Sequence, residues 1–328
     1  MADKTTPPFK PAWWLRNPHL QTLWPVFFRR RLRPQLRRER LELPDGDFVD
    51  LDWTLNASGP IVIILHGLEG SSRSHYARGM LTSLPQHGMR AVVMHFRGCS
   101  GEPNRLARAY HSGDTGDIDF LVRTLRAREP NTPLAAIGYS LGGNALLKWL
   151  GEAGAGALAH LLAAATVSAP LDLMAAGAAL GQGPNRIYTR MFLSTLRRKS
   201  LDKLARYPGL FDRDRVLRAR TLRQFDDVFT APLHGYRDTD DYWTRASSGP
   251  GLISVRLPTL VLNAKNDPFL PGRHLPGARQ VSPTVQLEQP MEGGHAGFVG
   301  GAFPGNLDWL PQRLLAFFGV HSAPAAVK

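Results

Sequence analysis

The sequence contains one cysteine, Cys99, in 328 residues, so an internal disulfide is excluded. This scarcity fits a reducing compartment. The first eight residues also lack the basic stretch and following apolar run of a secretory signal peptide. From these two absences we expect the protein to reside in the cytoplasm.

Long apolar runs are missing as well. The most apolar region, residues 155–180, is interrupted by His160, Ser168, Pro170 and Asp172, whereas a membrane-spanning helix needs about 20 consecutive apolar residues. This pattern predicts a buried strand with flanking helices. Because 43% of the residues are hydrophobic, the chain can bury a full core, and its length fits one large α/β domain with an insertion.

The formal net charge of +13 is concentrated in two segments. Residues 29–40 hold seven arginines against one glutamate, and residues 185–223 hold twelve Lys or Arg against three aspartates. Such segments either form a solvated face, with arginine stems that cover apolar surface, or attract an anionic partner. The second alternative predicts peripheral contact with an anionic membrane surface, at the inner face of the membrane. We expect no nucleic-acid partner, because no known binding module is recognisable.

Residues 134–147 join a short apolar run to a stretch with the apolar spacing of a helix. The pentapeptide at the join, residues 138–142, reads Gly-Tyr-Ser-Leu-Gly and matches the G-x-S-x-G nucleophile elbow. Glycine at both ends leaves room for a strained turn that presents the Ser140 hydroxyl. The helix that follows directs unpaired N–H groups and its positive dipole end toward that oxygen. We therefore predict that Ser140 is a nucleophile.

A serine nucleophile needs a base, and the base needs an acid that fixes its tautomer. In hydrolases with this elbow, the acid and then the histidine follow the serine along the chain. Three histidines lie beyond the late strand predicted at residues 258–263. His274 directly follows the loop of that strand and His321 is in the tail, whereas His295 occupies a glycine-flanked loop. His295 is therefore the predicted base.

Two aspartates could supply the acid. Asp267 follows the strand predicted at residues 258–263, and Asp172 follows the one predicted at residues 161–168. We predict Asp267, because its strand should lie next to the strand that delivers His295. Asp172 instead has the position of a helix N-cap, which would use its oxygens on backbone N–H groups.

A second glycine-rich turn, residues 66–72, follows the apolar strand predicted at residues 61–65. Backbone N–H groups in such a turn can stabilise an oxyanion, and we predict that Leu68 N–H does so together with Leu141 N–H. His66 is expected to hold the turn in shape. Cys99 is expected to be structural, because its loop offers neither an ordered histidine nor an oxyanion turn of its own.

These elements predict an α/β fold of the α/β-hydrolase type, with a mostly parallel central sheet, flanking helices and a helical cap insertion. Antiparallel strands are expected at residues 40–43 and 48–54, and Asn17 and Asp114 are expected to cap helices. The expected division is a Trp/Arg-rich segment packed on the core (1–38), the first part of the core (39–169), a basic helical cap (170–251), the second part of the core (252–320) and a disordered tail (321–328).

Several short motifs carry a family resemblance along nearly the whole chain, at residues 17–22, 66–72, 96–101, 110–113, 138–144, 230–235 and 293–295. With them the chain resembles the YheT-like bacterial hydrolases, part of the AB hydrolase 4 family within the α/β-hydrolase superfamily. The resemblance implies that Ser140, Asp267 and His295 match the triad positions of that family. It also implies hydrolysis of carboxylic esters without a metal or an organic cofactor.

The leading interpretation is a serine hydrolase that cleaves a small-molecule ester with an apolar acyl chain through an acyl-enzyme intermediate. A thioesterase or an acyltransferase would use the same three residues, because the difference depends on what the cap admits. A binding protein on this fold that has lost its chemistry is the alternative from another class. The intact set of three residues argues against it.

Overall fold

The computed structural model describes residues 6–28, 32–55 and 58–322. Its centre is an eight-stranded sheet with the strand order β1-β2-β4-β3-β5-β6-β7-β8. The strands are β1 (Leu36–Glu42), β2 (Phe48–Thr54), β3 (Ile61–Leu65), β4 (Arg90–His95), β5 (Leu134–Tyr139), β6 (Ala163–Val167), β7 (Thr259–Leu262) and β8 (Val285–Glu288). Only the β1–β2 and β2–β4 pairs are antiparallel. The prediction of a mostly parallel sheet is confirmed.

Apolar residues on the two faces of the sheet form two separate cores. In β3, Ile63 and Leu65 belong to a cluster that includes residues of α3 (Gly116–Arg128) and α4 (Leu141–Ala153). Ile64, which points to the other face, belongs to a cluster that includes residues of α2 (His75–Gln86) and α11 (Trp309–Ser322). A strand covered on both faces has no polar face, which explains why its sequence is continuously apolar.

Described residues of the N-terminal segment pack on the core. Asn17 Oδ1 accepts the N–H groups of His19 and Leu20, so it caps α1 (Pro18–Phe28). The indoles of Trp14 and Trp24 pack edge to face and donate to the carbonyls of Gly301 and Pro304, respectively.

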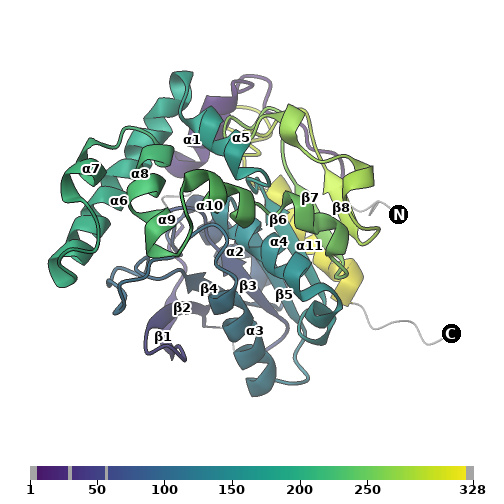
Figure 1. Ribbon diagram of the computed structural model, residues 1–328. Coiled ribbons are helices and arrows are strands. Elements are labelled where there is room, and N and C mark those ends of the chain that lie inside the picture. The colour runs from purple at the N-terminus through teal and green to yellow at the C-terminus, as the bar shows by residue number, and fades with distance from the viewer. Residues whose placement is uncertain (1–5, 29–31, 56–57, 323–328) are drawn as a thin grey trace.

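Residues 170–251, here called the cap segment, contain helices and no strand, and all of them are described. They form α5 (Leu173–Leu180), α6 (Arg186–Arg206), α7 (Arg213–Arg218), α8 (Leu222–Val228), α9 (Thr230–Leu233) and α10 (Thr239–Ala246). In Figure 1 these helices, in teal and green, gather above the sheet. A small apolar cluster of their own, which includes Leu193, Val216 and Phe225, holds α6, α7 and α8 together.

The positive charge of the cap segment divides between the inside and the surface. Lys203 is 5% exposed, and its ammonium group donates to Asn104 Oδ1 and to the carbonyl of Leu106. Arg190 and Arg213, in contrast, are exposed. Contact of these exposed cations with an anionic membrane surface stays a prediction, and the arginines at positions 29–31 lie outside the described residues.

Two elements cross the bounds of the expected division, and one helix cap differs from the prediction. Strand β1 begins at Leu36, inside the predicted N-terminal segment (1–38), because it pairs with β2 along its whole length despite its arginines. Helix α11 runs to Ser322, past the predicted core boundary at residue 320, and the rest of the predicted tail lies outside the described residues. Thr115, not Asp114, is the N-cap of α3, since both carboxylate oxygens of Asp114 accept from the guanidinium of Arg108.

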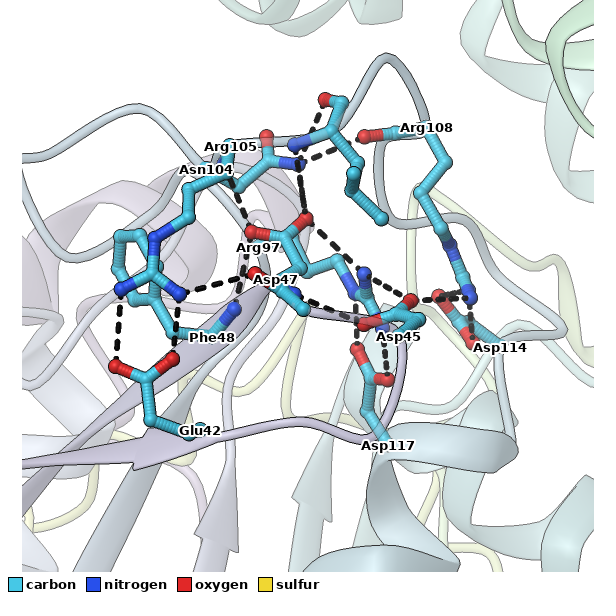
Figure 2. Close-up of polar contacts among 12 residues, drawn as sticks. Glu42, Asp45, Asp47, Phe48, Arg97, Asn104, Arg105, Arg108, Asp114 and Asp117 are labelled. Carbon is cyan, nitrogen blue, oxygen red and sulfur yellow. Dashed lines mark hydrogen bonds and ion pairs between the residues drawn. The ribbon is translucent and has the colours of Figure 1, made fainter.

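A buried ionic network fixes the loop that follows β4 (Figure 2). The Arg97 guanidinium, 4% exposed, makes two hydrogen bonds to Asp117 of 2.7 and 2.8 Å and one each to Asp45 and Asp47. Asp47 also accepts from Asn104 Nδ2 at 2.7 Å. A buried cation is tolerated only with such partners. The network therefore ties the loop to the β1–β2 turn and to α3.

We expect Arg97→Met to destabilise the protein by about 3–5 kcal/mol, because the carboxylates of Asp47 and Asp117 would remain buried without a counter-charge. Urea unfolding measures the change. Arg123→Met is the matched control, since Arg123 is exposed and pairs with Asp119 along one helix; it should change stability little. Equal midpoints for the two variants would contradict the role given to the network.

Candidate active site

The backbone at Ser140 is strained, as the elbow motif predicts. Ser140 lies between β5 and α4 with φ +50° and ψ −122°, a conformation that costs free energy for any residue with a side chain. A Cβ on Gly138 would lie 2.5 Å from the carbonyl oxygen of Gly142, and a Cβ on Gly142 would lie 2.5 Å from that of His66. Neither position has room for a side chain.

The structure brings Ser140, His295 and Asp267 into one hydrogen-bonded series. His295 Nε2 lies 2.9 Å from Ser140 Oγ, and His295 Nδ1 lies 2.9 and 3.1 Å from the two oxygens of Asp267. A carboxylate can only accept, so Nδ1 carries the proton and Nε2 is left to accept from the serine hydroxyl. Asp267 is 2% exposed and His295 is 9% exposed.

Loops from several elements hold the imidazole in this position. Asp267 follows β7 and His295 follows β8. The Phe269 ring stacks on the His295 ring with 3.9 Å between centroids. Thr22 Oγ1, from α1, accepts the backbone N–H of His295 at 2.9 Å. Ser168 Oγ accepts the next N–H, that of Ala296, at 2.9 Å.

The contribution of α1 to the position of the His295 loop was not predicted from the sequence. Besides Thr22, the fully buried Gln21 side chain accepts from Val299 N and donates to the carbonyls of Leu15 and Val299. It thus ties α1 to the chain just after the His295 loop. The signal available in the sequence was the motif at residues 17–22, which carried the family resemblance without indicating a contact.

The competing aspartate does not reach the imidazole. Asp172 Oδ1 accepts the N–H of Ala175 at 3.0 Å and caps α5, as predicted. Asp172 lies at the start of the cap segment, directly before α5, and Asp267 is the carboxylate bonded to His295.

His66 and Cys99 lie in environments that suit structural roles. His66 Nε2 accepts the N–H of Phe96 at 3.1 Å, so its Nδ1 carries a proton and donates to the Gly67 carbonyl at 2.8 Å. Burial lowers the pKa of His66 to about 3, so the ring stays neutral. Burial likewise raises the pKa of the Cys99 thiol to about 11, which disfavours the nucleophilic thiolate.

A cavity of about 530 Å³ opens above the hydroxyl of Ser140. Ser140, His295, Leu68 and Leu141 all border it. The cap segment covers it with mostly apolar side chains, including Leu173, Leu180, Phe192, Leu196, Leu222 and Phe225. The volume is within the range of small-molecule sites, roughly 300–1,000 Å³. The arrangement offers an apolar space beside a hydroxyl that is bonded to a base.

Two further properties concern the described residues only. They contain no group of three or more His, Cys, Asp or Glu placed to hold a metal ion. None of their helices combines the length and the hydropathy that crossing a bilayer requires.

Known proteins are similar to this chain in sequence or in fold. A family model described as the α/β-hydrolase fold matches residues 60–302. The chain is 42% identical over 312 residues to YheT of Escherichia coli (strain K12), whose name proposes an esterase; the match covers 93% of this chain and 91% of that protein. It is 34% identical over 323 residues to the phospholipase ABHD3 of Mus musculus, with 95% and 78% covered. The Pyrococcus furiosus esterase Pf2001 is similar in fold, with a TM-score of 0.56 and 15% identity, covering 96% of this chain and 99% of that one.

We expect Gly142→Ala to destabilise the protein by about 3 kcal/mol or more, because the added methyl group would meet main-chain carbonyls that cannot move aside. Thermal melting and soluble yield measure the effect. Gly319→Ala in α11 is the control, since nothing lies within 4 Å of the added Cβ; it should stabilise by about 0.5–1 kcal/mol. Similar melting temperatures for both variants would show that the elbow has spare room.

Proposed function

The chain belongs to the YheT-like hydrolases of the α/β-hydrolase family, and from this premise we propose that it cleaves carboxylic esters through an acyl-enzyme intermediate on Ser140. The observation that supports the proposal most directly is the hydrogen-bonded series from Asp267 through His295 to Ser140 Oγ. It supplies a nucleophile, a base with a free lone pair, and an acid that holds the base in that tautomer.

In the first half of the reaction, Ser140 Oγ attacks the ester carbonyl carbon while its proton moves to His295 Nε2. The carbonyl oxygen becomes an oxyanion, which the N–H groups of Leu68 and Leu141 stabilise. Collapse of this intermediate breaks the ester C–O bond. The leaving oxygen takes the proton from Nε2 and departs as an alcohol, and the acyl group remains on Ser140.

In the second half, water replaces the alcohol. His295 Nε2 takes a proton from the water as its oxygen attacks the acyl carbon. Collapse breaks the bond to Ser140 Oγ, which recovers a proton from Nε2, and a carboxylic acid leaves. Asp267 stays ionised throughout and stabilises the imidazolium that forms twice in each cycle.

The lining of the cavity favours a substrate with an apolar acyl chain. Burying the apolar surface of such a chain against the leucine and phenylalanine side chains would stabilise the complex by roughly 25 cal/mol per Å². A relative that shares a third of its residues carries the name phospholipase. We therefore propose lipid-like esters as the substrate class.

Ser140 should react with a fluorophosphonate probe, because His295 can take its proton. Ser140→Ala should label at background and lose at least about 10⁴-fold in turnover of nitrophenyl esters of graded chain length. Ser194→Ala is the control, since Ser194 is exposed on α6, and it should label like the wild type. Full labelling of the Ser140→Ala protein would move the nucleophile elsewhere.

Replacing each of the two aspartates by asparagine should give different results. Asp267→Asn should fold normally but lose on the order of 10⁴-fold in kcat, because an amide can donate to Nδ1 and force the wrong tautomer. Asp172→Asn should keep its activity and lose about 1 kcal/mol of stability or less. Ester kinetics and thermal melting of both proteins make the test, and the reverse pattern would reassign the acid.

A further inference from the structure

We propose that Tyr76 and Tyr110 are positioning residues for catalysis, which hold the Leu68 N–H in place for the oxyanion, and that Lys199 links this turn to the cap segment. The inference rests on the proposed function and adds to it three residues that do not touch the Ser140 hydroxyl. It comes from the hydrogen bonds of the turn at residues 66–70.

The two tyrosines occupy the N–H groups on either side of Leu68. Tyr76 Oη accepts the N–H of Gly67 at 2.8 Å, and Tyr110 Oη accepts the N–H of Glu69 at 2.8 Å. Between them, the Leu68 N–H has no acceptor among residues 6–28, 32–55 and 58–322. The N–H groups of Gly67 and Glu69 are thus fixed, and the N–H of Leu68 remains available at the edge of the cavity.

The turn needs such support because its backbone is strained. Glu69 has φ +55°, in the left-handed region that residues with a side chain seldom adopt. Tyr110 Oη also donates to Glu69 Oε1 at 2.8 Å, so a single hydroxyl bonds both the main chain and the side chain of that residue. The Tyr110 ring is itself fixed by stacking on Phe96, with 5.4 Å between centroids.

Tyr76 connects the turn to the elbow. Its ring stacks on that of Tyr139, with 4.3 Å between centroids and 21° between planes, and Tyr139 directly precedes Ser140. A Cβ built on Gly67 would lie 3.1 Å from the Cβ of Ser140, so the turn and the elbow are in direct contact. The spacing between the two proposed oxyanion donors, Leu68 and Leu141, therefore depends on this tyrosine pair.

Lys199 brings the cap segment into the same network. Its ammonium group, on α6, donates to Glu69 Oε1 at 2.9 Å. Lys203, one turn further along α6, bonds the loop at residues 104–108 and does not bond the turn. The orientation of the Glu69 carboxylate thus depends on α6 being seated over the cavity. A cap segment that lifts away would release one support of the oxyanion turn.

The proposal predicts an effect on kcat and not on KM, because the oxyanion forms only during the chemical step. Its negative charge develops in the transition state, so a misplaced donor slows the chemical step without weakening binding of the ester itself. A displacement of about 1 Å can cost on the order of 10²-fold in rate. Loss of a support that merely stabilises the fold would lower the melting temperature without this selectivity.

The experiment compares Tyr76→Phe, Tyr110→Phe and Lys199→Met with matched controls. For each protein, kcat and KM are measured with one ester, together with the inhibition constant of a trifluoromethyl ketone, which forms an oxyanion adduct with the serine. Tyr242→Phe is the control for the tyrosines, since Tyr242 Oη accepts the buried N–H of Ser112, which does not belong to the turn. Lys203→Met is the control for Lys199.

We expect kcat to fall about 10- to 100-fold in the tyrosine variants and less in Lys199→Met, with KM within about twofold of wild type. The inhibition constant should rise by the same factor as kcat falls. In both controls the melting temperature should drop while the ratio of the inhibition constant to KM stays at the wild-type value. If a phenylalanine variant does not fold, Glu69→Gln tests the same link, because it keeps the shape and removes the charge that Lys199 binds; it should show the same pattern, weakened.

Variants that raise KM at constant kcat, or that behave like their controls, would overturn the inference. A wild-type protein that neither hydrolyses esters nor labels at Ser140 would overturn the proposed function instead. The two failures are therefore distinguishable from the wild-type measurement alone.

Discussion

The close contact between two backbones, where α4 begins beside the end of β3, is the constraint on which the site depends. Gly142 lies so near the carbonyls of Leu65 and His66 that a Cβ there would approach both to 2.5 Å. The elbow and the turn at residues 66–70 therefore form one rigid unit. Because β3 and β5 are neighbouring parallel strands, both segments meet at the same edge of the sheet. The other functional side chains have to be positioned next to this unit.

The remaining groups reach that edge from far along the chain, and contacts between distant elements hold them there. His295 comes from the loop after β8, and Thr22 supports it across 273 residues of sequence. Asn266 Oδ1 accepts the N–H of Gly294, which binds the loops of Asp267 and His295 to each other. Each of these hydrogen bonds is buried or partly buried, so losing one partner would leave an unsatisfied polar group at a cost of about 1–3 kcal/mol.

The cap segment uses part of its positive charge within the molecule. Lys199 and Lys203 lie on one side of α6 and bond the two loops that border the cavity. The ionic network around Arg97 holds one of those loops from below (Figure 2). The lining of the cavity thus combines charged side chains, among them Lys199 and Lys203, with leucine and phenylalanine side chains.

The sequence by itself determined the sheet type, the elbow and the order of Ser140, Asp267 and His295, because continuous apolar strands and a glycine-bounded serine are local patterns. Tertiary structure decided the rest. Asp114 has the sequence position of a cap, yet both of its carboxylate oxygens accept from Arg108 Nη2, and this charge-assisted interaction is the stronger one. The arginine-rich β1 is a strand because β2 offers it a hydrogen-bonding edge. The sequence indicated no role for the hydroxyls of Tyr76 and Tyr110, since a tyrosine hydroxyl acquires a role only from the backbone N–H that the fold places beside it.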